Sequence, residues 1–328
     1  MNLKNKNVFV TGSSGFIGSH LVERLVQEQA NVTCFVKYNS KNSWGNLELL
    51  PKDFLSSLKI IPGDVRDIHI LHKSLKDIDI VFHLAALIGI PYSYTNPREN
   101  FQTNVLGTLN ILTAAQENNI QKFIHTSSSE VYGTPETLPI SEFHPLKGQS
   151  PYSASKVGAD KVVESFHYAY DFPSLILRPF NTYGPRQSAR AVIPTIITQA
   201  LTKDTLNLGN LNTTRDFLYV ADTVNGFIKA AESKLTGKTI QIGTGKETSI
   251  QELVKKISKI LNKEIKVNIE NNRIRPNKSE VLRLCADASK AKQLLDWQPS
   301  ISIDEGLERT ISWIKENINN YKTNIYNI

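Results

Sequence analysis

The chain has 328 residues, of which 40% are apolar and 21% charged, so it can form a buried core and is not wholly disordered. Lysine and arginine outnumber aspartate and glutamate by seven (38 against 31), which suits either a nucleic-acid binder or an enzyme of phosphorylated substrates. Because these basic residues form no block, we expect no nucleic-acid partner.

The first 180 residues alternate short apolar runs with helix-like stretches. The apolar runs are rich in Val, Ile, Leu and Phe, which predicts strands buried on both faces, at residues 8–11, 32–36, 58–61, 80–84, 123–127 and 175–177. Helices are predicted between them, at residues 16–29, 68–75, 100–117 and 152–170. Such repeated βα units predict an α/β fold, a Rossmann-type doubly wound parallel sheet with right-handed crossovers.

Beyond Pro179 this alternation is lost. Helices are predicted at residues 191–201, 220–232, 250–261 and 304–322, a strand at 239–243 and a polar loop at 271–278. Ser249 is a candidate N-cap for the third of these helices. In the last helix, Leu307, Ile311 and Ile314 follow helical spacing. The interrupted pattern predicts a smaller C-terminal α+β lobe that closes over the edge of the sheet.

The first predicted strand runs into a glycine-rich segment and then into a helix. Gly12, Gly15 and Gly18 follow the spacing G-x-x-G-x-x-G, which allows a tight turn and brings the backbone close to a pyrophosphate at the helix N-terminus. The alternative is a structural turn, but the strand before and the helix after favour nucleotide binding. We therefore expect residues 1–180, joined by part of 215–245, to form a dinucleotide-binding domain, and 181–328 mainly a substrate-binding lobe.

The end of the second strand bears on the choice of cofactor. An acidic residue there would bind the ribose 2′-hydroxyl of NAD, but the segment contains none. Lys37 and Lys41 could instead meet a 2′-phosphate, which favours NADP over NAD; the alternative is that both are solvated surface charges. Asp64 follows the third strand and could accept a hydrogen bond from an adenine amino group. Ala85 and Ala86 follow the fourth strand, where small residues let a cofactor pass closely.

Tyr152 and Lys156 lie four residues apart and would share one face of a predicted helix. The Lys156 ammonium could lower the pKa of the Tyr152 phenol and hold the nicotinamide ribose, which would make the tyrosinate a general base at neutral pH. Before this helix, at the end of the fifth strand, Ser128 could donate to an oxygen that is being oxidised, and Glu130 could exchange a proton beside it. The alternative for Glu130 is a structural carboxylate.

Six segments, in order along nearly the whole chain, together resemble the extended short-chain dehydrogenase/reductases, and more narrowly their NAD(P)-dependent nucleotide-sugar epimerases and dehydratases. These segments are 11–18, 83–86, 127–133, 152–156, 178–186 and 215–220. Further segments are similar to the 4,6-dehydratases of the legionaminic acid pathway, which act on GDP-linked N-acetylglucosamine: 38–40 with 42–45, 90–94, 185–194 and 275–281.

The resemblance implies the oxidation of a sugar nucleotide at C4. Tyr152 would remove the C4-hydroxyl proton while hydride moves to the nicotinamide, with Lys156 tuning Tyr152 and Ser128 polarising the C4 oxygen. Glu130 would take the acidified C5 proton, the C6 hydroxyl would leave as water, and hydride would return to C6. The implied product is a 4-keto-6-deoxy sugar nucleotide, and a tightly bound cofactor is regenerated in each turnover.

One residue departs from part of this family. The dTDP-glucose dehydratases place Thr-Asp-Glu where this chain has Ser128-Ser129-Glu130, and their Asp is the acid for the departing C6 hydroxyl. Ser takes that place in UDP-glucuronate decarboxylases, which need no such acid, and in GDP-mannose 4,6-dehydratases, whose Glu serves as base and acid. Beside a dehydratase of GDP- or UDP-N-acetylglucosamine, two alternatives stay open: a C4 epimerase or UDP-glucuronate decarboxylase, and a non-catalytic nucleotide-binding sensor.

The residue patterns and the resemblance together define the expected site. The expected catalytic residues are Ser128, Ser129, Glu130, Tyr152 and Lys156. The expected cofactor contacts are Gly12, Gly15, Phe16, Ile17, Gly18, Lys37, Asn39, Ser40, Lys41, Asp64, Val65, Leu84, Ala85, Ala86, Asn104, Tyr152 and Lys156. Arginine suits bidentate phosphate contacts. The expected substrate contacts, drawn largely from the family-like segments, are Tyr92, Ser128, Asn181, Arg186, Arg190, Arg215 and Arg275.

The remaining expectations concern partners and surroundings. In this family the helices at 100–117 and 152–170 pair with a second subunit as a four-helix bundle, so the resemblance implies a homodimer. Cys34 and Cys285 lie far apart, which argues against a disulfide framework and a thiolate metal site, and we expect no metal. The first six residues are polar and no apolar run reaches the ~20 residues of a membrane helix, so we expect a cytoplasmic protein without a membrane partner.

Overall fold

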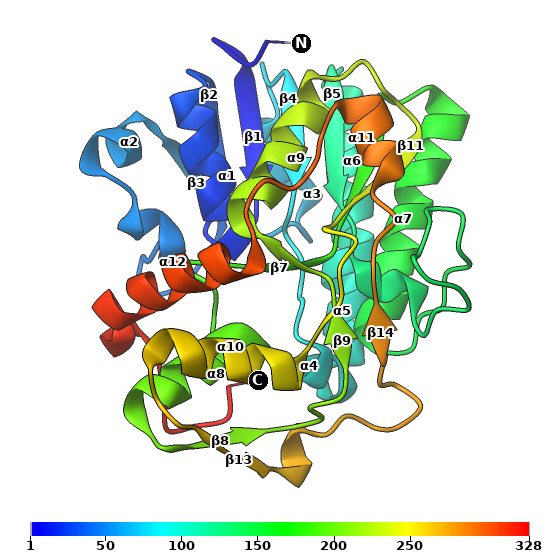
Figure 1. The fold of residues 1–328 in the computed structure, drawn as a ribbon. Helices are drawn as coiled ribbons and strands as arrows, with labels where there is room; N and C mark the ends of the chain where they lie inside the picture. The colour runs from blue at the N-terminus through cyan, green and yellow to red at the C-terminus, as the bar shows by residue number, and fades with distance from the viewer. Residues whose placement is uncertain (1, 328) are drawn as a thin grey trace.

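A computed structural model describes residues 2–327. Its centre is a seven-stranded parallel sheet in the order β11-β6-β5-β4-β1-β2-β3 (Figure 1). The strands are β1 (Asn7–Thr11), β2 (Asn31–Lys37), β3 (Lys59–Gly63), β4 (Ile80–His83), β5 (Lys122–Thr126), β6 (Ser174–Pro179) and β11 (Lys238–Ile242). The predicted doubly wound α/β fold is confirmed, and each predicted strand begins and ends within two residues of the observed one.

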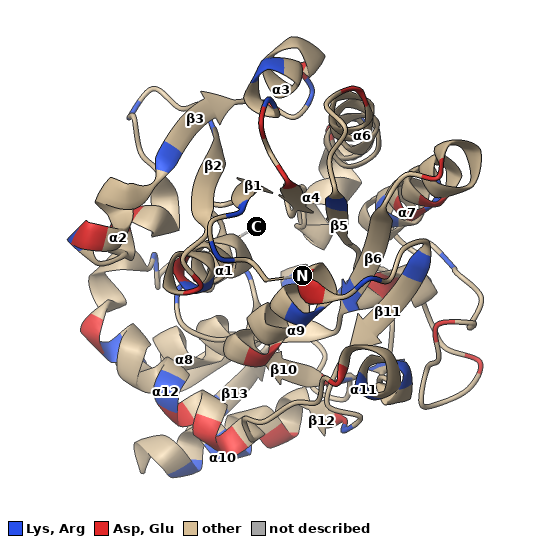
Figure 2. Cartoon of the chain, turned by 90° about the horizontal axis from the view of Figure 1, so that it is seen from above, with Lys and Arg blue, Asp and Glu red and all other residues tan. Residues whose placement is uncertain are grey.

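Helices cover both faces of this sheet (Figure 2). On one face lie α3 (Ile68–Ser74), α6 (Gly107–Glu117) and α7 (Pro151–Tyr170), and on the other α1 (Phe16–Gln27) and α9 (Val220–Glu232). The strands between them are mostly apolar because the central part of the sheet meets water on neither face; Val8, Phe9 and Val10 are fully buried in succession. The predicted helix at 100–117 is α5 (Pro97–Phe101), a π-helical turn (Gln102–Leu106) and α6 in continuous succession.

The second half of the chain forms small sheets and further helices, as its interrupted pattern predicts. The small sheets are β7 (Asn181–Tyr183) with β10 (Phe217–Tyr219), β12 (Thr248–Ser249) with β9 (Thr214–Arg215) and β14 (Arg283–Leu284), and β13 (Lys266–Ile269) with β8 (Thr205–Leu208). The helices are α8 (Val192–Thr202), α10 (Ile250–Leu261), α11 (Ser289–Leu295) and α12 (Ile303–Glu316). Strand β11 is part of the main sheet, and helix α9 packs against that sheet. The domain boundary near residue 180 stays a prediction.

Helix ends follow from local side chains. The Ser249 hydroxyl accepts from the Glu252 amide (3.1 Å) and caps α10, as predicted. The predicted helix at 304–322 is too long, because α12 ends at Glu316 and a short turn, Ile318–Asn320, follows. The Asn317 side chain donates to the carbonyl of Trp313 (2.9 Å), and asparagine competes with the helical backbone in this way.

Several short elements were not predicted, because runs of three to six residues carry little periodic signal. They are η1 (Gly45–Leu49), α2 (Lys52–Ser57), α4 (Ile90–Thr95), η3 (Ser129–Tyr132) and η4 (Asn271–Arg273). Within residues 2–327, no helix is both long and apolar enough to cross a bilayer. The same residues contain no group of three or more His, Cys, Asp or Glu side chains that could hold a metal ion.

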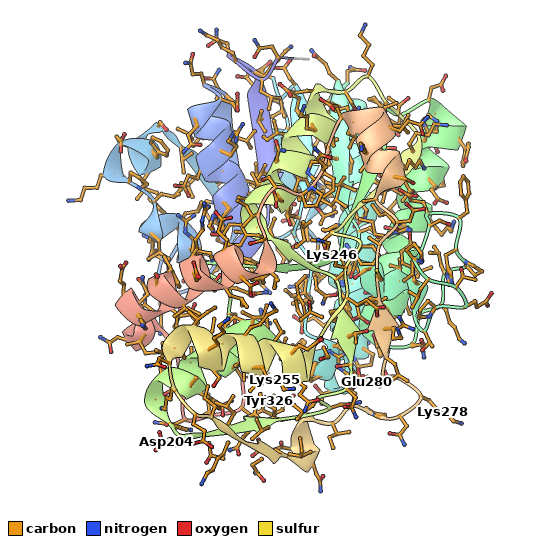
Figure 3. The ribbon with its side chains drawn as sticks, in the orientation of Figure 1. Asp204, Lys246, Lys255, Lys278, Glu280 and Tyr326 are labelled. Carbon is orange, nitrogen blue, oxygen red and sulfur yellow. The ribbon has the colours of Figure 1, made fainter. Side chains whose placement is uncertain are left out.

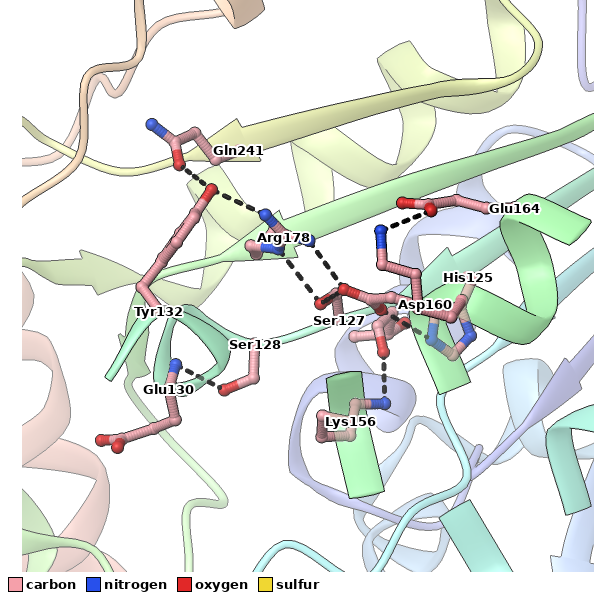
Figure 4. Close-up of polar contacts among 12 residues, drawn as sticks. His125, Ser127, Ser128, Glu130, Tyr132, Lys156, Asp160, Glu164, Arg178 and Gln241 are labelled. Atoms are coloured by element: carbon pink, nitrogen blue, oxygen red, sulfur yellow. Dashed lines mark hydrogen bonds and ion pairs between the residues drawn. The ribbon is translucent and has the colours of Figure 1, made fainter. Parts of the chain in front are cut away.

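A buried ionic network joins the elements behind the strand ends (Figure 4). The Asp160 carboxylate on α7 accepts from Arg178 Nη2 on β6 (2.7 Å) and from the Ser127 hydroxyl at the end of β5 (2.6 Å). Arg178 Nη1 also donates to the Tyr132 hydroxyl (2.7 Å), which donates to Gln241 on β11 (2.7 Å). Burial alone would raise the pKa of Asp160, but Arg178, with help from His125 and Ser127, holds it well below its usual range.

Replacing Arg178 with Met would leave the Asp160 carboxylate buried without its cation. We expect the free energy of unfolding to fall by about 3–5 kcal/mol, the usual cost of removing one partner of a buried pair. Urea denaturation followed by circular dichroism measures this change. The double variant Asp160→Asn/Arg178→Met removes both charges and should recover much of the loss; an undiminished loss would show that packing, and not charge, is responsible.

Candidate active site

A cavity of about 790 Å³ lies where the carboxyl ends of the main strands face the smaller lobe. Segments after β1, β3, β4 and β5 line it on one side, together with Tyr152 and Lys156 of α7. Residues from 179–195, 208–217 and 273–280 line it on the other side. In open parallel sheets this is the edge where ligands bind, because the connecting loops meet there.

The glycine-rich turn after β1 packs too closely for side chains. Gly12 has φ +68°, and a Cβ atom there would lie 2.8 Å from the Ala85 amide nitrogen. A Cβ atom at Gly18 would lie 2.1 Å from the Gly12 carbonyl oxygen. The Thr11 hydroxyl accepts from the amides of Leu84 and Ala85 (both 3.1 Å) and ties the turn to the end of β4. The turn opens α1 against the cavity, so these residues fit the pyrophosphate of a dinucleotide.

Most of the other expected cofactor contacts also line the cavity: Phe16, Ile17, Lys37, Asp64, Val65, Leu84, Ala85 and Ala86. Asn39, Ser40 and Lys41 do not. The Asn39 side chain instead accepts from the amides of Lys41 (3.2 Å) and Ser43 (3.1 Å), which closes its own loop. Of the two lysines expected near a 2′-phosphate, the structure therefore leaves Lys37 alone at the cavity.

Asn104 is also absent from the cavity wall, and its amide has a structural role. It accepts from the Leu87 amide (2.8 Å) and donates to the Leu87 carbonyl (2.9 Å) and to the Ser155 hydroxyl (2.9 Å). These bonds hold the segment after β4 against α7. Asn104 therefore positions cavity-lining residues without reaching the cavity itself.

Two chain segments bring the expected catalytic residues together. Ser128 is the N-cap residue of η3, two residues after the end of β5, and its hydroxyl accepts from the Glu130 amide (3.2 Å; Figure 4). Tyr152 and Lys156 come from the first turns of α7, whose start is held by the Ser150 hydroxyl. Lys156 Nζ donates to the Thr126 carbonyl (2.6 Å), which links α7 to the end of β5. Ser128, Ser129 and Glu130 line the same cavity as Tyr152 and Lys156.

The predicted lowering of the Tyr152 pKa by Lys156 is wrong. Burial raises the pKa of Tyr152 to about 12, and the Ser128 hydroxyl only partly opposes this. Burial also lowers the pKa of Lys156 to about 8. The free energy needed to remove a phenolate from water exceeds the stabilisation that the surrounding groups provide. The Lys156 ammonium donates its hydrogen bond to a backbone carbonyl. Tyr152 therefore holds its proton at physiological pH.

A row of alternating charges extends from Glu130 along the cavity wall. Glu130 Oε1 lies 3.9 Å from Arg215 Nε, and Arg215 Nη2 lies 3.6 Å from Glu280 Oε1. Arg275 Nη1 lies 3.5 Å from the same Glu280 oxygen. Burial lowers the pKa of Arg215, and the neighbouring Glu130 opposes that shift. The row brings a candidate proton carrier and two expected phosphate contacts into one connected group.

The remaining expected substrate contacts divide in two. Asn181, Arg186 and Arg190 line the cavity, whereas Tyr92 does not, because its hydroxyl donates to Glu99. Arg186 Nη2 pairs with Glu23 on α1 (2.7 Å).

Several buried polar atoms at the cavity have no hydrogen-bond partner within the described residues: Thr126 Oγ1, Asn181 Oδ1, Arg186 Nε and Nη1, Gln187 Oε1 and Arg275 Nη1. Buried polar groups are nearly always paired. Their concentration at this cavity indicates that it receives a polar ligand.

Sequence reasoning missed further residues that line the cavity, among them Gln187, Arg273, Glu280 and Tyr326. Gln187 and Glu280 lie in segments that carry the family resemblance, so a usable signal was present. Arg273 and Tyr326 lie in a polar loop and beyond the last helix, where no motif or periodicity marks them. Contacts between distant segments bring these last two to the cavity.

Comparison with known proteins agrees with this geometry. A family model described as GDP-mannose 4,6 dehydratase matches residues 9–310. A putative UDP-glucose 4-epimerase of Methanocaldococcus jannaschii is 35% identical over 94% of this chain and 99% of its own length. A UDP-N-acetyl-alpha-D-glucosaminuronate decarboxylase of Bacillus cytotoxicus is 35% identical, over 95% of this chain and 98% of its own.

Two dehydratases are similar over the same extent. The human dTDP-D-glucose 4,6-dehydratase is 32% identical over 97% of this chain and 92% of its own. The dTDP-glucose 4,6-dehydratase DesIV of Streptomyces venezuelae, solved with NAD bound, superposes with a TM-score of 0.88 at 29% identity, covering 96% of this chain and 99% of that one. A matching family model across most of the chain, relatives of this identity and a shared fold lead to one conclusion. The chain belongs to the GDP-mannose 4,6-dehydratase family of extended short-chain dehydrogenase/reductases, whose members include nucleotide-sugar dehydratases, epimerases and decarboxylases.

Proposed function

We propose that this protein is a nucleotide-sugar 4,6-dehydratase that converts GDP- or UDP-linked N-acetylglucosamine to its 4-keto-6-deoxy derivative. The observation that carries this proposal is the Glu130 carboxylate, which shares one cavity with Ser128 and Tyr152 and lies 3.9 Å from Arg215. Inversion at C4 requires no proton carrier at the neighbouring carbon, whereas elimination across C5 and C6 does. The resemblance to the legionaminic acid pathway dehydratases supports the GDP-linked substrate.

The cofactor would be held by the glycine turn and by the wall around it. Gly12, Gly15 and Gly18 would face the pyrophosphate at the start of α1, and Lys156 would contact the nicotinamide ribose. When bound, the nicotinamide ring supplies the acceptor for hydride from C4 and returns that hydride to C6. The glycines, Ala85 and Ala86 leave space along this path because they carry at most a methyl group.

The residues of the chain would move the protons. As a phenolate, formed when its own proton passes to solvent, Tyr152 takes the C4-hydroxyl proton as that carbon is oxidised, and Ser128 donates a hydrogen bond to the same oxygen. The resulting ketone acidifies C5, so Glu130 removes the C5 proton. Glu130 is then a carboxylic acid beside C6 and gives this proton to the departing hydroxyl, which leaves as water. As hydride returns to C6, C5 takes up a proton from solvent, which balances the proton that Tyr152 removed from the C4 hydroxyl. Ser129 in the place of an acidic residue is compatible with this scheme, because one carboxyl group serves both steps.

Three alternatives share parts of this scheme. A C4 epimerase or a UDP-glucuronate decarboxylase would use the same C4 oxidation, and relatives with both kinds of names match the chain. Ser129 favours the decarboxylase, which needs no acid at C6. A nucleotide-binding sensor would need the cavity but has no use for Tyr152, Lys156 and Glu130 together.

Incubation with GDP- and with UDP-N-acetylglucosamine should give a product that has lost one water, because Glu130 is available for elimination. Mass spectrometry of the sugar nucleotide measures this loss. The loss of carbon dioxide from a uronate substrate would identify a decarboxylase, and a C4-epimerised sugar of unchanged mass would identify an epimerase. Either result without water loss contradicts the proposal.

Two variants separate the proton carriers in this experiment. Glu130→Gln should slow water loss by at least about 100-fold while reduced cofactor still accumulates, since oxidation at C4 does not need this carboxylate. Tyr152→Phe should abolish both changes. Glu136→Gln, an exposed carboxylate outside the cavity, is the matched control and should behave as wild type. Full biological activity of Tyr152→Phe in cells would instead support a sensor.

We propose NADP as the cofactor, because Lys37 lines the cavity and could contact a 2′-phosphate. NAD is the alternative, and it is the cofactor bound in the DesIV structure. Lys37→Ala should weaken NADP binding roughly tenfold, the usual effect of losing a charge-assisted contact, and leave NAD binding unchanged. Titration calorimetry on protein stripped of cofactor measures both. Lys41→Ala, outside the cavity, is the control. An equal effect of Lys37→Ala on both cofactors would reject a 2′-phosphate contact.

We also propose a homodimer through the face formed by α5, the π-helical turn and α6, beside α7. Phe101, Leu106 and Leu109 are exposed there by 42%, 52% and 38%. Apolar side chains that cluster on one exposed face of a folded protein usually mark a contact surface. The family pairing of these helices in a four-helix bundle supports a second copy of this chain as the partner.

The double variant Leu106→Glu/Leu109→Glu places two charges in this face and should convert the dimer to a monomer, because buried unpaired charges are costly. Size-exclusion chromatography with light scattering measures the mass. Ile269→Glu, at an exposed apolar position on β13 in the smaller lobe, is the control and should stay dimeric. A wild-type monomer, or a dimer that survives the double change, would exclude this interface.

A further inference from the structure

We propose that Arg273 and Tyr326 form the wall that receives the nucleobase of the substrate, and that this wall favours a purine over a pyrimidine. The inference rests on the proposed function, because it takes the substrate to be a sugar nucleotide. Neither residue belongs to a motif, and Tyr326 lies in the segment after α12.

Arg273 and Tyr326 are stacked on each other at the cavity. The guanidinium carbon of Arg273 lies 4.3 Å from the centre of the Tyr326 ring, a cation–π contact. Arg273 Nε donates to the Glu270 carboxylate, which fixes the orientation of the guanidinium group. A Cβ atom at Gly209 would lie 2.5 Å from the Arg273 carbonyl oxygen, so η4 packs directly on the end of β8. The pair is therefore part of the cavity wall and is held by its neighbours.

The segment 321–327 that carries Tyr326 is anchored across the smaller lobe. The Tyr321 hydroxyl donates to the Gln187 carbonyl (3.0 Å), and Lys203 Nζ donates to the Thr323 carbonyl (3.2 Å). The Tyr321 ring meets Trp313 of α12 edge to face, with ring centres 6.2 Å apart. These contacts bring Tyr326 to the cavity from a part of the chain far from every motif.

The order of groups along the cavity matches the order of parts in a sugar nucleotide. Glu130 marks the sugar end, and Arg215 and Arg275 come after it, joined through Glu280. Arg273 is two residues from Arg275 in the chain and presents Tyr326. Figure 3 labels Glu280 and Tyr326 in the lower part of the molecule, among the elements of the smaller lobe, and both line the cavity. A substrate with its diphosphate at the two arginines would thus extend its nucleoside toward Arg273 and Tyr326.

The chemistry of this wall suits an aromatic base. Bases stack on tyrosine rings and on guanidinium planes with little regard to their hydrogen-bonding edges. A purine has the larger ring system and so gains more from such a surface. The amide side chains of Asn210 and Asn327 also line the cavity, and each offers donors and an acceptor to a base edge.

Calorimetric titration of the cofactor-loaded protein with GDP and with UDP tests this proposal without turnover. Tyr326→Ala should weaken GDP binding by about tenfold, in the range of one lost stacking contact, and UDP binding by less. Tyr326→Phe keeps the ring and should restore GDP binding. Tyr168→Ala, an exposed ring on α7 outside the cavity, is the matched control. Cofactor content should be the same in all variants.

Three results would overturn the proposal. Unchanged GDP affinity in Tyr326→Ala would show that the base lies elsewhere, and tighter binding would show that the ring occupies the site and competes with the nucleotide. A larger effect on UDP than on GDP would reject the purine assignment. Failure of the proposed function looks different, because neither sugar nucleotide would then lose water with the wild-type protein, whatever its affinity for GDP and UDP.

Discussion

The buried ion pair between Asp160 and Arg178 is the contact on which the active site depends. Asp160 lies on α7, two turns after Tyr152, and its carboxylate also accepts from Ser127, the residue before Ser128. Arg178 extends the same network to Tyr132 in the turn that carries Glu130. Buried pairs contribute little net stability, yet they are costly to break. The role of this pair is therefore geometric: it holds the phenol, the serine hydroxyl and the carboxylate at one edge of the sheet.

A row of alternating charges extends from Glu130 along the cavity wall. Glu130, Arg215, Glu280 and Arg275 form a row in which each arginine meets a carboxylate at 3.5–3.9 Å. These distances are longer than direct charge-assisted hydrogen bonds, so the arginines are not fully engaged. A diphosphate can therefore reach them without displacing a tight ion pair. The same row connects Glu130, the proposed proton carrier, to the part of the cavity that would bind the nucleotide.

One scaffold can serve dehydratases, epimerases and decarboxylases because their chemistry diverges only after a shared first step. In the proposed mechanism, Tyr152, Lys156 and Ser128 would provide for oxidation at C4, which all three reactions need. The fate of the oxidised sugar then depends on the two side chains after Ser128, where this chain has a buried serine and a carboxylate that is 9% exposed. A carboxylate without a second acid supports elimination only if it both takes and returns the proton.

Local patterns in the sequence were sufficient for the fold and for the first half of the site. Unbroken apolar runs encode strands buried on both faces, the glycine spacing encodes a turn without room for Cβ atoms, and the spacing of Tyr152 and Lys156 encodes one helix face. The tertiary structure alone decided which polar residues reach the cavity: Glu280, Arg273 and Tyr326 arrive there, while Asn39, Lys41, Tyr92 and Asn104 make other bonds. It also reversed the expected direction of the Tyr152 pKa shift. The reason is physical, because burial and the partners of a polar group depend on segments that are distant in the chain, which no local pattern records.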